Sequence, residues 1–209
     1  MPSKEEYDSA RVLKHGDFVN KTMKNSIIGV AGLGGLGSNI CSMLTRMGAG
    51  KLVIVDFDTV DLTNMNRQNY FERHLNMKKT VATEEILKDI DPNVRVEKFT
   101  EKLNPDNIKG IFNGCDIVCE ALDSAAEKTM FIQTILAQCP GVRVVSGSGM
   151  AGYGKSNAIR TEKKLDRLYL CGDGVDLEDC ESIMTAPRVI LCAAHMANTV
   201  VAVLNGKEI

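Results

Sequence analysis

Short apolar runs alternate with longer stretches of helical periodicity along most of this 209-residue chain. Five apolar or alternating runs predict strands, at residues 27–31, 52–55, 94–99, 116–121 and 142–145. Four amphipathic stretches between them predict helices, at residues 38–47, 78–90, 104–112 and 124–138. This alternation indicates an α/β fold, Rossmann-like, with a mostly parallel sheet and helices on both faces.

The two ends of the chain depart from this alternation. Residues 1–25 are polar with scattered apolar positions, which predicts one or two amphipathic helices. Residues 158–159 and 168–170 indicate short strands, so we expect a few antiparallel strands toward the C-terminus. The acidic stretch 173–181 is typical of a solvated loop, and a last apolar helix is predicted from residue 185 to 204.

Proline marks two of the helix boundaries. The helix at 78–90 is expected to end where Asp91 meets Pro92, because proline cannot continue it. Asn104 is expected to cap the next helix, with Pro105 at its first position.

Between the first strand and the first long helix lies a glycine cluster, Gly32, Gly34, Gly35 and Gly37. Three of these glycines fit G-x-G-x-x-G, and Asp56 follows 19 residues after the last of them, at the end of the second strand. Such a turn lets a phosphate approach the backbone at a helix N-terminus, and the acidic residue can accept hydrogen bonds from ribose hydroxyls. The turn alone could equally serve tight helix–strand packing; the complete unit predicts an adenine nucleotide.

The segment after Asp56 indicates which nucleotide. Asn64 and Arg67 lie three residues apart and would share a face of a helical turn, and Lys79 follows at the start of the next helix. Two cations converging on the glycine turn suit a triphosphate better than a dinucleotide's pyrophosphate.

These stretches (GLGGLGS, DFDTVDLTNMNRQ, MKKT and ALDS, in this order) resemble the ThiF/MoeB/HesA family, relatives of the ubiquitin-activating enzymes. The resemblance runs from about residue 26 to 154 and is nearest to short ThiF-like proteins of anaerobic bacteria. It implies a single adenylation domain over 1–209: an N-terminal helical segment (1–25), a nucleotide-binding core (26–154), and C-terminal strands and helix (155–209).

Members of this family adenylate the C-terminal glycine of a small ubiquitin-like sulfur carrier with a Gly-Gly end, so the resemblance implies a ThiS-like carrier, thiamine biosynthesis and a homodimer. It assigns Arg67, Lys79 and Asp123 to catalysis, with Asp123 also holding the Mg²⁺ that bridges ATP phosphates. Asp123 follows a strand at the carboxyl edge of the expected sheet. The alternative is that Asp123 only caps the helix beginning at Ser124.

Two further residues are weighed against the family pattern. In larger relatives an N-terminal arginine reaches the nucleotide of the other subunit; Arg11 is the one candidate before Arg46, but its surroundings favour a solvated helix residue. Some members carry a cysteine that joins covalently to the carrier. Cys171 lies in that region, but Asp173 beside it would disfavour a reactive thiolate.

Composition narrows the function classes. A net charge of −2 and a pI near 6.0 give no electrostatic case for nucleic acid. The first residues lack the apolar region of a signal peptide. No apolar run is expected to approach the length of a membrane-spanning helix, roughly 18 to 20 residues, so a cytoplasmic protein is expected. Seven cysteines in mainly apolar runs, without C-x-x-C pairs, indicate reduced buried thiols and no structural zinc.

Three other functions remain open at this point. A nicotinamide-dependent dehydrogenase would use the same glycine turn and Asp56, but it leaves the Asn64, Arg67 and Lys79 set unexplained. A dehydratase acting on a modified tRNA adenosine is disfavoured by the missing basic patch. A nucleotide-binding partner subunit without catalysis is the third.

Overall fold

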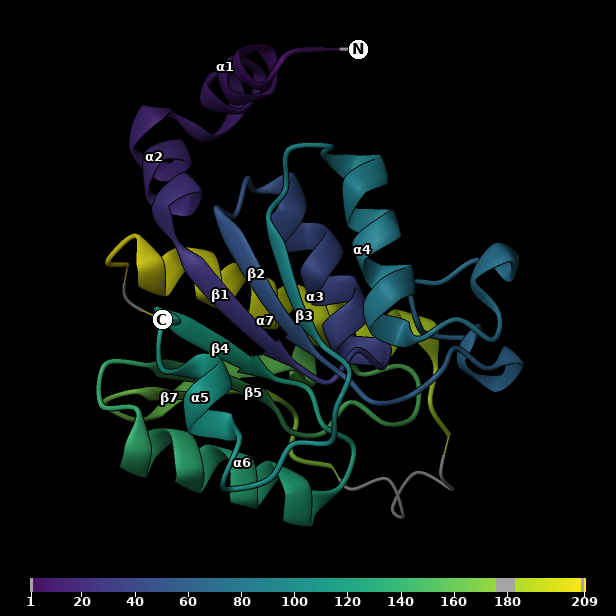
Figure 1. Cartoon of the computed structure of the whole chain (residues 1–209). Coiled ribbons are helices and arrows are strands. Elements are labelled where there is room, and N and C mark those ends of the chain that lie inside the picture. Colours follow the sequence, from purple (N-terminus) through teal and green to yellow (C-terminus); the bar gives the residue numbers. More distant parts are fainter. Residues whose placement is uncertain (1, 176–182, 208) are drawn as a thin grey trace.

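In the computed structural model, which describes residues 2–175, 183–207 and 209, seven strands form one sheet (Figure 1). Their order across the sheet is β3-β2-β1-β4-β5-β7-β6. In chain order the strands are β1 (Ile27–Ala31), β2 (Lys51–Val55), β3 (Val96–Phe99), β4 (Ile117–Glu120), β5 (Arg143–Gly147), β6 (Arg160–Leu165) and β7 (Leu168–Gly172). All neighbours pair in parallel except β6 and β7. The predicted fold class is confirmed, with one antiparallel pair near the C-terminus.

Helices cover both faces of this sheet (Figure 1). One face carries α3 (Gly35–Arg46), α4 (Lys79–Ile90) and α7 (Ala186–Leu204), and the other carries α5 (Ile108–Phe112) and α6 (Ala125–Gln138). Two further helices, α1 (Lys4–His15) and α2 (Asp17–Asn25), precede β1. Three 3₁₀ turns complete the elements: η1 (Leu62–Asn64), η2 (Glu72–His74) and η3 (Ser156–Ala158).

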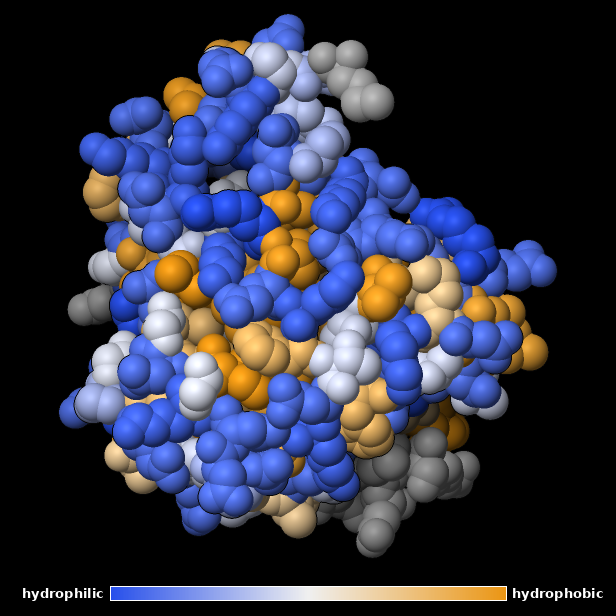
Figure 2. Space-filling view, viewed as in Figure 1, coloured by the Kyte–Doolittle hydropathy of each residue, from blue (hydrophilic) through white to orange (hydrophobic). Residues whose placement is uncertain are grey.

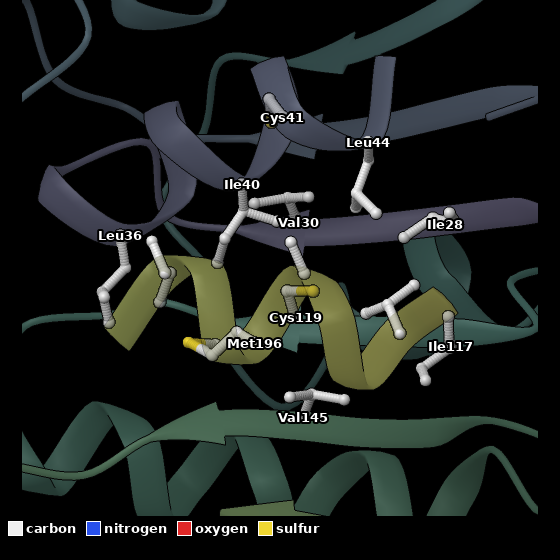
Figure 3. Packing of buried hydrophobic residues seen from close by; sticks show 14 of the residues in the cluster. Ile28, Val30, Leu36, Ile40, Cys41, Leu44, Ile117, Cys119, Val145 and Met196 are labelled. Carbon is white, nitrogen blue, oxygen red and sulfur yellow. The ribbon is translucent and has the colours of Figure 1, made fainter. Parts of the chain in front are cut away.

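Each face of the sheet has its own apolar core. Figure 3 shows Ile40 of α3 against Val30 of β1, with Leu44 of α3 and Met196 of α7 in the same apolar cluster. On the opposite face, the rings of Phe112 and Phe131 meet edge to face with centroids 5.4 Å apart. Both sheet faces are therefore buried, which explains why β1, β2 and β4 are continuous apolar runs.

Helix α7 corrects one expectation. Of the described residues, Ala186–Leu204 form one helix that is long and apolar enough to cross a membrane by length and composition, so the statement that no run approaches a span was wrong. Half of that window is buried, and the helix packs on α3, β5 and β7. Its position in the core accounts for its apolar composition.

Two predicted boundaries also need correction. Helix α5 begins at Ile108, not at Pro105, because Asn104 accepts the backbone N–H groups of Asp106 and Asn107 and so caps a separate turn before the helix. Residues 158–159 do not form a strand, since residue 158 ends η3. Most of the predicted acidic loop (173–181), with Cys180, lies outside the described residues; the six cysteines described are free and buried, as predicted.

Arg11 joins the N-terminal helices to the body of the protein. Its guanidinium lies 2.5 Å from the carboxylate of Asp91 and 3.5 Å from the carbonyl of Thr45, and its side chain is 13% exposed. The interpretation as a solvated residue was therefore wrong. The rest of α1 buries no residue, and its surface is mainly hydrophilic at the top of Figure 2. Arg11 is thus a main attachment of this helix.

Replacing Arg11 by alanine is expected to lower the free energy of unfolding by about 1–3 kcal/mol, because it removes a charged hydrogen bond and leaves the buried Asp91 without its cation. Urea denaturation measures the change. Arg73→Ala is the matched control: Arg73 pairs with Asp89 at 2.9 Å, but both side chains are more than half exposed, so this loss should stay below about 1 kcal/mol. Equal losses in the two variants would contradict the assigned role.

His74 is buried in the segment between β2 and α4. Its Nδ1 accepts the backbone N–H of Phe71 at 3.0 Å, and its Nε2 has no partner among the described residues. Burial, helped by the neighbouring Arg73, lowers the pKa of His74 below its ordinary value. The imidazole is therefore held neutral in the folded state.

Because the unfolded chain binds this proton more readily, stability should be complete above about pH 6.5, the usual histidine pKa, and fall as the pH drops through the lowered folded pKa. His74→Asn keeps an acceptor for Phe71 but cannot titrate. Urea midpoints between pH 7.5 and 5.5 should fall more steeply for the parent than for this variant. Identical pH slopes would show that His74 does not contribute.

Candidate functional site

The carboxyl ends of β1, β2 and β4 meet at one edge of the sheet and surround a depression. It encloses about 590 Å³ of space, part of it open solvent. Five predicted site residues line it: Gly32, Gly34, Asp56, Lys79 and Asp123. Strand order explains this meeting, since β1 lies between β2 and β4.

The glycine turn after β1 is required by close packing. Gly32 has φ +90°, and a Cβ there would lie 2.6 Å from the carbonyl oxygen of Ala121. A Cβ at Gly37 would lie 1.9 Å from the carbonyl oxygen of Gly32. Helix α3 therefore starts directly against the strand ends. Gly34 is its N-cap and supplies no side chain, so the first-turn N–H groups remain available to a ligand.

Asp56 is nearly buried at the end of β2. Its carboxylate accepts the backbone N–H groups of Leu33 and Asp58, each at 2.7 Å. Lys79, at the start of α4, lies 2.9 Å from the carboxylate of Asp58 and 4.0 Å from that of Asp56. Burial raises the pKa of Asp56, while Lys79 and the two backbone donors act against this shift. Lys79 thus lines the same depression as the glycine turn.

Asp123 lies exposed on the opposite wall of the depression. Ser124, not Asp123, caps α6, because its hydroxyl accepts the N–H of Glu127 at 3.2 Å. The capping alternative for Asp123 is therefore wrong. Buried Glu120 fixes the turn that carries it, by accepting the N–H of Leu122 and pairing with Lys128 at 3.1 Å.

Neither Arg67 nor Asn64 lines the depression. The stem of Arg67 runs along Gly35, where a Cβ would be 3.4 Å from its Cγ, and its guanidinium donates to Asn66 at 2.8 Å and to the carbonyl of Thr63 at 3.4 Å. The Asn64 side chain accepts the N–H of Asp61 within its own turn. Arg67 is at the correct edge of the sheet, yet its charged end is engaged with its own loop.

Several lining residues escaped the sequence analysis. Lys102 forms an ion pair with Glu127 at 3.3 Å across the depression, and its ammonium lies 5.6 Å from the ring centre of Phe57. The sequence could have indicated Lys102 by its position just after β3, because the carboxyl end of β3 reaches the same edge of the sheet as the depression. Asp58, the partner of Lys79, could have been suggested only by its spacing from Asp56.

Cys171 lies fully buried within β7, beside the hydroxyls of Thr161 and Thr199. Burial raises the pKa of its thiol, the opposite of what a nucleophile needs. Its position gives no support to a covalent role.

Two relatives are similar in sequence to part of this chain. The chain is 35% identical over 139 residues to the adenylyltransferase and sulfurtransferase uba4 of Ogataea parapolymorpha, covering 66% of this chain and 35% of that one. It is 32% identical over 147 residues to the molybdopterin-synthase adenylyltransferase of Haemophilus influenzae, covering 69% of this chain and 59% of the relative. The chain thus spans only part of the length of these proteins.

Among solved structures, the E. coli tRNA N6-threonylcarbamoyladenosine dehydratase superposes with a TM-score of 0.85 over 96% of this chain and 94% of that one. The identity is 18%, so this similarity concerns the fold. The ThiF family profile matches residues 9–209, nearly the whole sequence. The chain therefore belongs to the ThiF family.

Proposed function

We propose that this chain adenylates the C-terminal glycine of a small ubiquitin-like sulfur carrier, using ATP and releasing pyrophosphate, with residues 1–209 acting as one adenylation domain. The observation that carries the proposal is the meeting of Lys79 and Asp123 with the glycine turn and Asp56 in one depression. These residues come from four separate segments of the chain, and bound ATP would contact all of them through its ribose, its phosphates and its metal ion. Two relatives of this chain are named adenylyltransferases, which supports the same reaction.

In this proposal the ribose of ATP hydrogen-bonds to Asp56 and the phosphates lie on the N-terminus of α3. The carrier's terminal carboxylate attacks the α-phosphorus, an acyl–phosphate bond forms, and the bond to the β-phosphate oxygen breaks as pyrophosphate leaves. The carboxylate is already ionised, so no general base is needed. Catalysis then consists of positioning and charge neutralisation, to which Lys79 and Arg67 contribute.

Asp123 fits the role of a Mg²⁺ ligand. Its carboxylate is exposed, faces Gly34 and forms no ion pair with any described residue. Mg²⁺ needs only one or two carboxylates when phosphate oxygens and water complete its shell, so the lack of a cluster of three acidic, His or Cys groups among the described residues does not exclude it. When bound, the ion would neutralise phosphate charge.

The pathway and the assembly belong to the same proposal. Thiamine biosynthesis is the proposed context, and a homodimer the proposed assembly. The name of the Haemophilus relative refers to molybdopterin synthase, so ThiS-like and molybdopterin-type carriers should be tested side by side. A tRNA substrate fits the net charge of −2 poorly and should be included as the third substrate in this comparison. Titration with ATP, with and without Mg²⁺, and with NAD separates the dehydrogenase alternative.

Replacing Arg67 by alanine should lower carrier-dependent ATP–pyrophosphate exchange by about 10²–10³-fold, the range seen when one group that stabilises transition-state charge is lost. The free energy of unfolding should change by less than about 0.5 kcal/mol, because the guanidinium bonds only to its own loop. Exchange of labelled pyrophosphate into ATP measures the first effect and urea denaturation the second.

Arg73→Ala is the matched control, since Arg73 belongs to the same β2–α4 connection but pairs with Asp89 on the surface. It should exchange at the parent rate. An Arg67→Ala protein that also exchanges near the parent rate would remove Arg67 from the mechanism. A parent protein with no exchange for any carrier would refute the proposed reaction itself.

A further inference from the structure

The side chain of Gln68 is buried at the edge of the candidate site without a complete set of partners. It is 8% exposed, and its amide oxygen has no hydrogen-bond partner among the described residues. A buried amide oxygen without a hydrogen-bond partner lowers the stability of a fold, so a glutamine is an unusual residue at this position unless its amide group has another role. Nothing in the proposed reaction has so far used this residue.

Its amide faces the glycine turn. A Cβ built on Gly34 would lie 3.9 Å from the amide nitrogen of Gln68 and 3.8 Å from a carboxylate oxygen of Asp123, with no atom closer. The space in front of Gly34 is therefore bounded by an amide on one side and a carboxylate on the other. Because Gly34 is the N-cap of α3, the same space receives the first-turn N–H groups of that helix.

The backbone around Gln68 is fixed to α3 on both sides. Asn39 donates to the carbonyl of Arg67 at 3.2 Å, and the N–H of Asn69 donates to the hydroxyl of Ser38 at 3.0 Å. These bonds direct Arg67 outward along Gly35 and Gln68 inward, so adjacent residues approach the site from different sides. The position of the amide is thus set by the packing of the loop.

We propose that Gln68 is a phosphate-contacting residue: its amide donates a hydrogen bond to a non-bridging phosphate oxygen of the nucleotide held in front of Gly34, opposite Asp123. This inference rests on the proposed nucleotide function. A neutral donor suits this position because it stabilises phosphate oxygens without repelling the Mg²⁺ assigned to Asp123. The NH₂ group of Gln68, which faces Gly34, is the donor in this contact.

The test compares Gln68→Leu, which keeps the volume and removes the amide, with the parent protein. Gln68→Leu should melt at the same or a higher temperature in the absence of ligand, bind Mg·ATP about tenfold more weakly, and lose about 10- to 100-fold in pyrophosphate exchange. Its affinity for adenosine, which has no phosphate, should not change. Gln133→Leu, an exposed glutamine on α6, is the matched control and should behave as the parent.

A structural role predicts the opposite pattern. A lower melting temperature with unchanged Mg·ATP affinity of the folded protein, in Gln68→Leu and also in Gln68→Met should the first variant not fold, would overturn the inference. So would parent-like binding and exchange. If the parent binds Mg·ATP but shows no exchange, the proposed adenylation fails while the ATP and adenosine affinities of the variants still decide the role of Gln68.

Discussion

The buried carboxylate of Asp56 is the interaction on which the site depends. One oxygen accepts the N–H of Leu33 in the turn after β1, and the other accepts the N–H of Asp58 just after β2. Lys79, at the start of α4, lies 4.0 Å away. One charged group therefore aligns two strand ends and a helix N-terminus. Burial raises the pKa of Asp56, and these same donors and Lys79 favour its ionised form.

The glycines are the second constraint, because they allow α3 to approach the strand ends more closely than residues with side chains would. With Gly32 and Gly37 in contact, α3 starts so close to the strand ends that its N-terminus opens into the depression between β2 and β4. At Gly35 the neighbour is α7, since a Cβ there would lie 2.7 Å from the side chain of Val189. The long apolar helix α7 therefore helps to hold α3 in position, which links the core to the site.

The sequence allowed the fold to be predicted because both sheet faces are buried and most of the described helices span at least nine residues. Periodicity located β1, β2, β4 and α6 to within a few residues. It failed where individual side-chain hydrogen bonds decide: Asn104 caps a turn instead of α5, and Arg11 pairs with Asp91, 80 residues away in sequence. Motif spacing singled out Asp56, Lys79 and Asp123, which line one depression, but it could not indicate Lys102 or the orientation of Gln68. Those depend on loop packing that no periodic pattern encodes.

The charges around the depression explain why a nucleotide would need a metal ion there. Five carboxylates line it, against the two ammonium groups of Lys79 and Lys102: Asp56, Asp58, Glu101, Asp123 and Glu127. Lys79 is committed to Asp58 and Lys102 to Glu127, so the lining offers little uncompensated positive charge. A triphosphate entering alone would face repulsion at short range. A divalent cation at Asp123 would supply the missing charge, and release of the Arg67 guanidinium from Asn66 and Thr63 would add a further cation from the adjoining loop. If the proposed function holds, the site would favour the metal complex of ATP, because its own side chains would not neutralise the free nucleotide.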